Sequence, residues 1–490
     1  MTHFQKTAII PRVISRILYL PIETIARELD ANLLIAHEAL KRGYIIVLGE
    51  KREVQRYARE LGGGVYIYKH WEALFPYRFG DERRKHFFYA GSHQEGVVYI
   101  DDTFFLRRGI EQNKTHLLDV YFARGKAQEA LLKRAYPLLE SVVEVTGSPS
   151  FDILRDQYRT IFQERCELLS RTWSPFILVN TNFTAGNKTP HEVEDVLVER
   201  EKSSVKNLGR SLTENEKSFF LGLATYKERL FQEYVAMVRA LSVRFSDTNI
   251  IVRPHPSENH LNWRRELHGL KNVRVIYSGN VIDWILASKA VIHTGCTTGI
   301  EAWAVGKPVL RYNPLGKSSE YESELPNKFG RYFATIPELE VAIKNIGADN
   351  KSTDSFVMQG DFLKPYMDSV SGELATVREL DSIERRGDIG PKLVYEDIVR
   401  NYRTFVRSLR IIIKRLAYAL FRHPSITRFL LGRHEAALRA SRLQKFPYLS
   451  RRYISRMLRK FEMIDSMKPR GLRFVRIDVN TYIMTVTDTV

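Results

Sequence analysis

Short apolar runs alternate with helical stretches along most of this chain, and the alternation occurs twice. The first series of predicted strands comprises residues 16–20, 44–48, 65–68, 97–100, 120–122 and 142–145. After a polar stretch over 152–171, predicted to be one long helix, a second series follows at 176–180, 249–253, 273–277, 290–293 and 308–312. Strands that alternate with helices form parallel sheets covered by helices. The chain is therefore predicted to be an α/β protein with two Rossmann-like domains that face each other across a cleft.

Two segments depart from this alternation. Residues 188–216 are charged and weakly periodic, which predicts an insertion or a mobile loop. Residues 401–476 carry 20 Lys or Arg and three acidic residues, whereas the remainder is almost neutral although the whole chain has a net charge of +18. In 404–421 and 448–464 the basic and apolar residues fall on different faces at helical spacing. The predicted organisation is a domain over 1–165, a domain over 166–390 and a basic, amphipathic helical tail over 391–490.

The composition indicates in which cellular compartment the protein lies and which class of partner it binds. The 490 residues include two cysteines, Cys166 and Cys296, which are too few for a disulfide framework and indicate a reducing compartment. We find no secretory signal and no run of about 18 apolar residues, the length that crosses a bilayer. A basic tail suits an anionic lipid surface or nucleic acid. Lipid is favoured because the tail has neither zinc-finger spacing nor an aromatic RNA-binding signature. The alternative is an appendage that packs on the protein body and keeps a solvated basic face.

The segment 249–259 has the residues of an anion-binding turn. The predicted strand ends at Arg253, and two prolines, the second of them Pro256, stiffen the turn that holds His255 and Ser257. Ligands of open α/β sheets bind beyond the carboxyl ends of the strands, and Arg and His are side chains that hold phosphate there. The alternative is a structural turn in which His255 caps a backbone carbonyl.

A second candidate loop follows the predicted strand 290–293. It is rich in small and hydroxyl residues and leads into a helix near Ile300. Gly and Thr let a ligand approach the backbone, and the N–H groups at a helix start attract phosphate. The alternative is a well-capped turn in which Cys296 is a small buried residue, and we do not expect Cys296 to be a nucleophile because no His–acid pair is apparent beside it. The candidate nucleotide-binding residues are His293, Thr294, Gly295, Thr297, Thr298 and Glu301, the last as an acceptor for a ribose diol.

These loops and further motifs resemble a known family. The His-Pro turn, the hydroxyl-rich loop and the EA…GKPV sequence resemble the donor half of GT-B glycosyltransferases. More closely, the chain resembles the bacterial surface carbohydrate biosynthesis family, which is related to the CMP-Kdo-dependent β-Kdo transferases of capsule and O-antigen synthesis. The resemblance covers residues 16–315 and leaves the basic tail outside. Its motifs are 20–36, 41–43, 145–154, 177–183 (ILVNTNF), 284–290 (WILASKA) and 293–302 (HTGCTTGIEA).

The resemblance implies a catalytic acid at the end of the predicted strand 97–100. Related CMP-sugar transferases carry two acids and then Gly at such a strand end, whereas this chain has Asp101, Asp102 and Thr103. Asp102 would be the nucleophile of a retaining enzyme or, in an inverting enzyme, the base that activates the acceptor hydroxyl, and Asp101 is the second candidate. The alternative for either residue is a turn-forming role.

The resemblance also implies contacts to the sugar or the acceptor from four residues of the first domain, Glu23, Arg27, Glu28 and Gly147. A structural ion pair between Glu23 and Arg27 is the alternative for those two. Asn180 and Asn182 follow the first strand of the second domain and either line the cleft or cap the turn.

The predicted function is that of a GT-B glycosyltransferase of bacterial surface polysaccharide (capsule, O-antigen, lipopolysaccharide) synthesis. It would move Kdo or a related ulosonic acid from a CMP-activated donor to a glycan or lipid-linked glycan acceptor. No DxD motif accompanies the proposed phosphate loop, so we expect no metal and no cofactor. The tail is expected to bind the inner face of the cytoplasmic membrane through residues 401–476, which makes the enzyme cytoplasmic and peripheral. The alternatives are a CDP-glycerol or CDP-ribitol polyol-phosphate transferase, a UDP-GlcNAc 2-epimerase and a non-catalytic sugar-nucleotide-binding scaffold.

Overall fold

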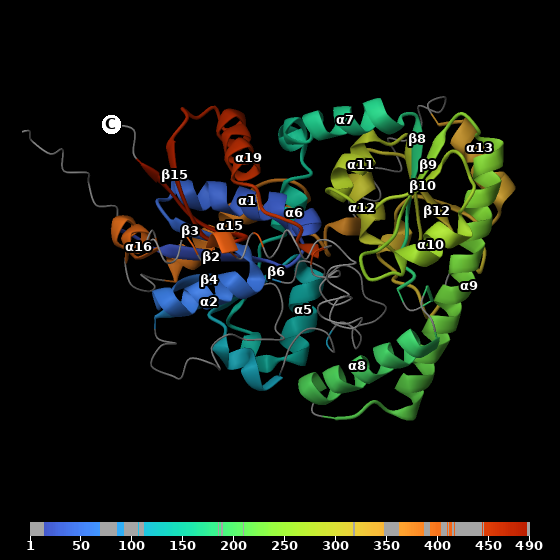
Figure 1. The fold of residues 1–490 in the computed structure, drawn as a ribbon. Helices are drawn as coiled ribbons and strands as arrows, with labels where there is room; N and C mark the ends of the chain where they lie inside the picture. Colours follow the sequence, from blue (N-terminus) through green and yellow to red (C-terminus); the bar gives the residue numbers. More distant parts are fainter. Residues whose placement is uncertain are drawn as a thin grey trace, which may run out of the picture.

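Two α/β domains lie side by side in the computed structural model, as the sequence predicts (Figure 1). Each has a sheet flanked by helices, and the polypeptide passes from the first domain to the second near residue 162. The structure describes residues 14–68, 86–92, 106, 112–184, 186–187, 190–208, 210–316, 319–346, 362–386, 393–402, 409, 411–413, 416, 443 and 445–487.

The sheet of the first domain contains parallel strands in the order β3-β2-β4-β5-β6-β7. The central strand β2 is buried along its whole length, because helices cover both faces of the sheet. The strands are β2 (Ile17–Ile22), β3 (Ile45–Glu50), β4 (Gly64–Tyr68), β5 (Phe87–Ser92), β6 (Val120–Ala123) and β7 (Val143–Val145). The helices are α1 (Ile25–Lys41), α2 (Lys51–Leu61), α5 (Lys126–Ala135) and α6 (Pro149–Asp152).

The sheet of the second domain is parallel in its described part, with the order β10-β9-β8-β11-β12-β13. The strand order reverses between β8 and β11, and open α/β sheets bind ligands outside such a switch point. The strands are β8 (Phe176–Asn180), β9 (Asn249–Arg253), β10 (Val273–Val275), β11 (Ala290–His293), β12 (Val309–Tyr312) and β13 (Arg331–Phe333). The helices are α7 (Gln163–Trp173), α8 (Pro190–Leu208), α9 (Glu214–Arg244), α10 (His260–Glu266), α11 (Val281–Ala287), α12 (Thr297–Ala304) and α13 (Ile336–Lys344).

Helix α8 and the first part of α9 protrude below the second domain, whereas the rest of α9 packs on the second sheet (Figure 1). Of the two expectations for 188–216, an insertion or a mobile loop, the mobile loop is therefore wrong for Pro190–Leu208. A small apolar cluster of Leu212, Phe220 and Leu223 joins the two helices, and Thr213 starts α9 with a capping box to Glu216. The predicted long helix over 152–171 is also wrong, because the chain there forms α6, a 3₁₀ turn and then α7.

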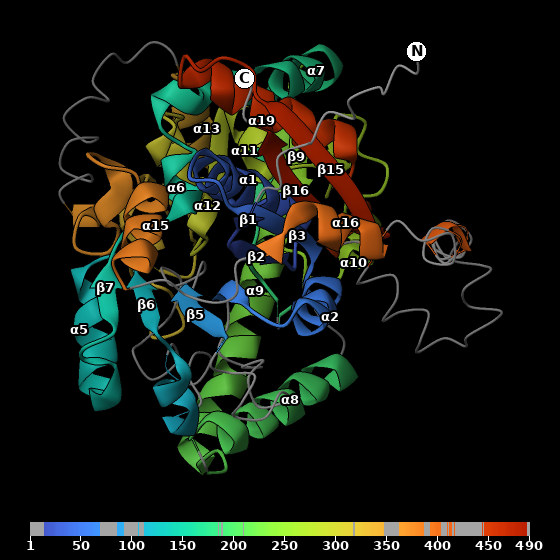
Figure 2. The same ribbon diagram turned by 90° about the vertical axis from the view of Figure 1, so that its left-hand side faces the viewer.

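The C-terminal part of the chain returns to the first domain. Helix α15 (Ala375–Arg385) packs on α1 and α6, and helix α19 (Arg451–Ile464) packs on α1. The hairpin β15 (Gly471–Asp478) and β16 (Thr481–Thr487) extends the first sheet, because β16 pairs antiparallel with β3. In Figures 1 and 2 this hairpin runs beside β3 and α19 lies above α1. Short elements β1 (Ile14–Ser15), β14 (Leu393–Val394) and α16 (Tyr395–Tyr402) complete this part.

This return corrects two expectations. The predicted helical tail over 391–490 holds for α16 and α19 but is wrong for 471–487, where β-branched and aromatic residues pair with an open sheet edge. The predicted second domain over 166–390 includes α15, whose packing partners belong to the first domain. Among the described residues, no helix has the length and apolar character needed to cross a membrane.

Candidate functional site

A pocket lies between the two domains at the carboxyl ends of both sheets. The first domain lines it with the start of α1 and with the loops that follow β6 and β7. The second domain contributes the ends of β8 and β9, the turn before α11 and the start of α12. The pocket therefore occupies the switch point between β8 and β11, where the topology favours ligand binding.

Many of the predicted site residues meet in this pocket. Members of both candidate loops of the second domain line it together, although they are separated by about 40 positions in the sequence. Two first-domain candidates line its opposite wall. The predicted residues that the structure brings together are Arg27, Glu28, Asn180, Arg253, His255, Pro256, Thr297, Thr298 and Glu301.

His255 forms a contact across the cleft. An Nη of Arg27, at the start of α1, lies 3.0 Å from Nε2 of His255. On the other side of the ring, Nδ1 of His255 lies 2.6 Å from the hydroxyl and 3.2 Å from the backbone nitrogen of Ser257. The His255 ring is thus held in place by one residue from each domain.

The buried carboxylate of Glu258 fixes the turn that carries His255, and sequence reasoning missed it. Its Oε1 accepts from the backbone N–H of His255 (3.1 Å), the hydroxyl of Thr181 (2.7 Å) and the N–H of Phe183 (3.1 Å). Its Oε2 accepts from the indole N–H of Trp263 at 2.8 Å. These bonds join the end of β9 to the end of β8. The position of a Glu three residues after the His-Pro histidine was the available signal.

Arg253 lines the pocket, but two of its nitrogens are used within the protein. They donate to the carbonyls of Ser278 at 2.7 Å and Gly279 at 2.6 Å, and the guanidinium lies 5.0 Å from the centre of the Tyr277 ring. Burial lowers the pKa of Arg253 to about 10, so the group stays charged at neutral pH. Its charge therefore acts on the pocket while its hydrogen bonds order the turn before α11.

The residues from His293 to Gly295, at the end of β11 and in the loop that follows it, contact other parts of the protein and do not line the pocket. His293 is fully buried, donates from Nε2 to the carbonyl of Phe329 (3.1 Å), and burial lowers its pKa to about 4. The hydroxyl of Thr294 donates to Glu322 (3.2 Å), and Asn182 donates to the carbonyl of Gly295 (3.3 Å). These four predicted donor-binding residues, His293, Thr294, Gly295 and Asn182, lie outside the pocket lining.

Polar atoms that lack a partner among the described residues lie at the end of β8 and in α12, two elements that line the pocket. Asn180 is 2% exposed, and neither its amide oxygen nor its amide nitrogen has a hydrogen bond. Oε2 of Glu301 is also buried without a partner. Burial raises the pKa of Glu301, while the charges of Arg27, Arg124 and Arg253 oppose that rise. Buried polar groups are normally bonded, so these atoms point to a polar ligand.

Of the first-domain residues predicted to contact the sugar or the acceptor, some line the pocket and others lie outside its lining. Glu28 lines the pocket, but its carboxylate accepts from the N–H groups of Glu23 (2.9 Å) and Thr24 (3.1 Å) and so fixes the turn that leads into α1. Glu23 lies outside the lining, with its carboxylate 3.9 Å from Nζ of Lys51. Gly147 also lies outside, at a positive φ of 91°, where a Cβ would collide with the Ser369 side chain.

Two further findings concern the first domain. The structure adds Arg124, which is buried and lines the pocket directly after β6. An Arg-Gly pair between a strand and a helix was the available signal. The predicted catalytic residues Asp101 and Asp102 lie outside the described residues.

Comparisons with known proteins were made by sequence and by structure. No protein family model and no curated protein matches the sequence. Among solved structures, the wall teichoic acid polymerase TagF is 12% identical over 76% of this chain and 88% of that chain, with a TM-score of 0.48. The UDP-GlcNAc 2-epimerase from Neisseria meningitidis, bound to UDP-GlcNAc, is 11% identical over 68% of this chain and 80% of that chain, with a TM-score of 0.40. S. aureus MnaA with UDP is 13% identical over 76% and 96%, with a TM-score of 0.42. Sequence identities and TM-scores this low do not indicate which reaction this protein catalyses. The function has to be inferred from the side chains of the site.

Proposed function

We propose that this protein is a glycosyltransferase that binds a nucleotide-activated sugar in the pocket between its domains. The observation that carries the proposal is Asn180, whose buried amide has unused donors and acceptors at the switch point of the second sheet. A nucleotide offers matching donors and acceptors. The start of α12 supplies N–H groups for its phosphate, and Glu301 can accept from a ribose hydroxyl.

The charges around the pocket support an anionic ligand. Three arginines line the pocket together with Glu301, namely Arg27 and Arg124 from the first domain and Arg253 from the second. A nucleotide that departs from a sugar develops negative charge on its phosphate, and fixed cations and helix N–H groups stabilise that charge. In this proposal the protein's own groups meet the charge, so the reaction proceeds without a metal or another cofactor.

The finer assignment comes from the sequence resemblance. It proposes CMP as the nucleotide, Kdo or a related ulosonic acid as the sugar, and a surface glycan or lipid-linked glycan as the acceptor. Asp102, with Asp101 as second candidate, is proposed to meet the sugar as nucleophile or base. The enzyme would then serve the synthesis of a bacterial surface polysaccharide.

The test is a calorimetric panel of CMP, CDP, UDP and GDP on the full-length protein, with EDTA present in a parallel series. We expect CMP to bind, with and without EDTA, and the Asn180→Ala variant to bind about tenfold more weakly, because it loses the amide's hydrogen bonds to the ligand. Binding of CDP in preference to CMP would favour the polyol-phosphate transferase. Preference for UDP would overturn the CMP assignment, and no binding at all would refute the function.

A cytoplasmic location at the inner face of the cytoplasmic membrane remains part of the proposal, with a narrower anchor. In α19 the predicted basic face is partly used within the protein, because Arg456 pairs with Glu164 at 2.8 Å and Arg459 pairs with Glu462 at 2.7 Å. The membrane contact is therefore assigned to residues 403–445, which carry eleven Lys or Arg and one acidic residue, Glu435.

A further inference from the structure

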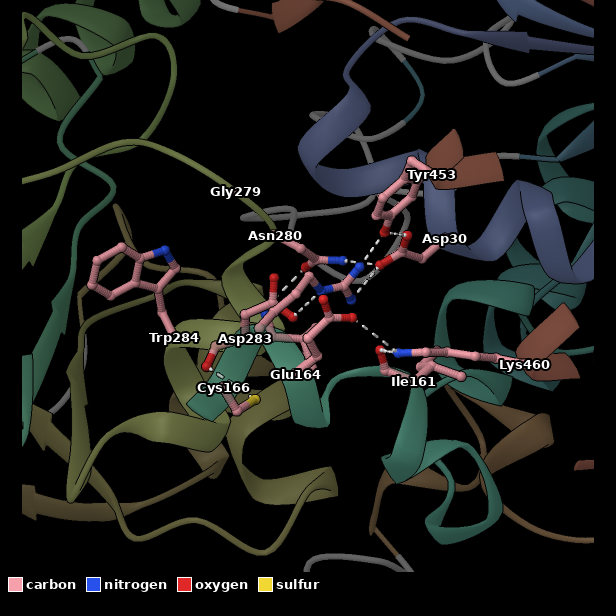
Figure 3. A network of polar contacts seen from close by, with 12 residues as sticks. Asp30, Ile161, Glu164, Cys166, Gly279, Asn280, Asp283, Trp284, Tyr453 and Lys460 are labelled. Atoms are coloured by element: carbon pink, nitrogen blue, oxygen red, sulfur yellow. Dashed lines mark hydrogen bonds and ion pairs between the residues drawn. The ribbon is translucent and has the colours of Figure 1, made fainter. Parts of the chain in front are cut away.

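A polar network joins the two domains beside the pocket. Figure 3 shows the side chains of Asp30, Asn280, Asp283 and Tyr453 gathered there. The centre of the network is Arg165, in the helix α7 that connects the domains. The guanidinium donates to Asp30 on α1 of the first domain at 2.9 Å, and to Asp283 on α11 of the second at 2.8 Å. It also bonds the hydroxyl of Tyr453 on α19. Four helices from distant parts of the sequence thus meet at one cation.

Asp30 is the member of this network that reaches the pocket. It is 4% exposed, and its two oxygens accept three kinds of donor. Oδ1 accepts from the Tyr453 hydroxyl, while Oδ2 accepts from Arg165 and, at 3.0 Å, from the amide of Asn280. Both Asp30 and Asn280 line the pocket, whereas Tyr453 and Arg165 do not. Tyr453 therefore acts on the pocket only through Asp30 and Arg165.

Asn280 connects the network to the nucleotide side of the pocket. Its Oδ1 caps α11 by accepting from the N–H of Ile282 at 3.0 Å. The two residues before it, Ser278 and Gly279, present the carbonyls that hold the guanidinium of Arg253. A fixed Asn280 consequently fixes the 278–280 turn, and this turn fixes Arg253 at the end of β9.

The helix α19 that carries Tyr453 is firmly attached to the first domain. Ile454, Met457, Leu458 and Phe461 are buried in the core of that domain. Near the other end of the helix, Asp465 accepts from His37 of α1 at 2.9 Å. Since α19 cannot move independently of α1, its tyrosine is a rigid support for Asp30.

We propose that Tyr453, Asp30 and Arg165 form a clamp through which the C-terminal helix positions the 278–280 turn for nucleotide binding. The inference rests on the proposed function and deepens it, because it gives the C-terminal segment a role in the same site. Tyr453 and Arg165 are positioning residues in this scheme, and Asp30 transmits their effect to Asn280.

The test compares nucleotide affinity in single and double variants of the full-length chain. Tyr453→Phe removes one hydroxyl and keeps the ring, and we expect the Kd of the nucleotide that binds best in the panel to rise about three- to tenfold. Asn280→Asp keeps the oxygen that caps α11 but opposes Asp30 with a second carboxylate, and it should also weaken binding. If both substitutions act through Asp30, their effects do not add, and the Kd of the double variant equals the higher of the two Kd values of the single variants.

The matched control is Tyr448→Phe, which removes a hydroxyl bonded to Arg476 at 2.7 Å in the same C-terminal segment. Its nucleotide affinity should equal that of the wild type. A Tyr453→Phe protein that binds like the wild type overturns the clamp, as do fold-changes that multiply in the double variant. Should Tyr453→Phe fail to fold, Arg165→Lys replaces it under the same criteria. A wild-type protein that binds no nucleotide refutes the proposed function instead, and the clamp with it.

Discussion

Asp283 is the residue from which a pH dependence of stability follows. Burial raises its pKa from the ordinary 3.8 to about 6, although Arg165 at 2.8 Å opposes the rise; Asp30 adds to it. The folded state holds this proton more tightly than the unfolded state does. The stability that Asp283 contributes is therefore complete below pH 4 and is lost as the pH rises through 6. A rise of about two pH units in the pKa of Asp283 corresponds to a contribution of about 3 kcal/mol to the free energy of unfolding.

The measurement is the free energy of unfolding, by chemical denaturation, of the wild type and of Asp283→Asn between pH 4 and 7. His293 makes the variant necessary as a reference. Burial lowers the pKa of His293 from 6.5 to about 4, so its contribution is lost as the pH falls and opposes that of Asp283. We expect the wild type to lose about 3 kcal/mol relative to Asp283→Asn as the pH rises. A constant difference would show that Asp283 is ionised throughout.

At the scale of residues, the sequence predicted which side chains would meet but not all of their tasks. His255 and Glu301 were found because a turn after a strand and the start of a helix each have a local pattern. Glu258 was missed because its spacing from His255 is a weak local signal, and its bonds to Thr181 and Trp263 depend on the fold. Arg253 was expected to hold phosphate directly, and its bonds to two carbonyls depend on where the 278–279 turn lies in space.

Among the secondary-structure elements, β16 has the most direct consequence for stability. Ile483 on this strand is fully buried and is paired with Val47 of β3. We expect Ile483→Ala to lower the free energy of unfolding by about 2–5 kcal/mol, because it leaves a cavity in the first domain. The exposed Val243, replaced by Ala, should change it by less than about 0.5 kcal/mol. Chemical denaturation measures the free energy of unfolding of both variants. If the two substitutions lower it equally, the hairpin does not belong to the core of the first domain.

The elements of the two sheets could be predicted because each buried strand is a continuous apolar run, as in β2 and β8. Residues 471–487 carried a strand signal of their own but follow a long basic segment, whose helical periodicity dominated the interpretation. Helix α8 was missed because its apolar face is narrow, with Val198 and Val205 about half exposed. Helix α8 is stabilised by its contact with α9, and the sequence pattern of neither helix predicts that contact.

At the scale of the whole molecule, the distribution of charge separates a structural part of the basic segment from the part that we propose to bind the membrane. Residues 446–476 include nine Lys or Arg, and four of these form ion pairs with Glu164 or Glu462, namely Arg456, Arg459, Lys460 and Arg470. Deletion of 401–490 is therefore no test of membrane binding, because it removes α19 and the β15-β16 hairpin from the first domain. A test has to neutralise charge and keep the fold.

The last prediction follows from this separation. A variant with all eleven Lys and Arg of 403–445 replaced by Gln should lose binding to vesicles that contain phosphatidylserine, because each cation near such a surface contributes about 1 kcal/mol. Wild-type binding should weaken when salt rises from about 0.1 to 1 M, which shortens the Debye length to about 3 Å. The control replaces Arg452 and Lys468, two exposed cations of the structural part, by Gln and should bind nearly as the wild type does. Vesicle sedimentation measures all three proteins, and undiminished binding of the neutralised variant would remove 403–445 as the anchor.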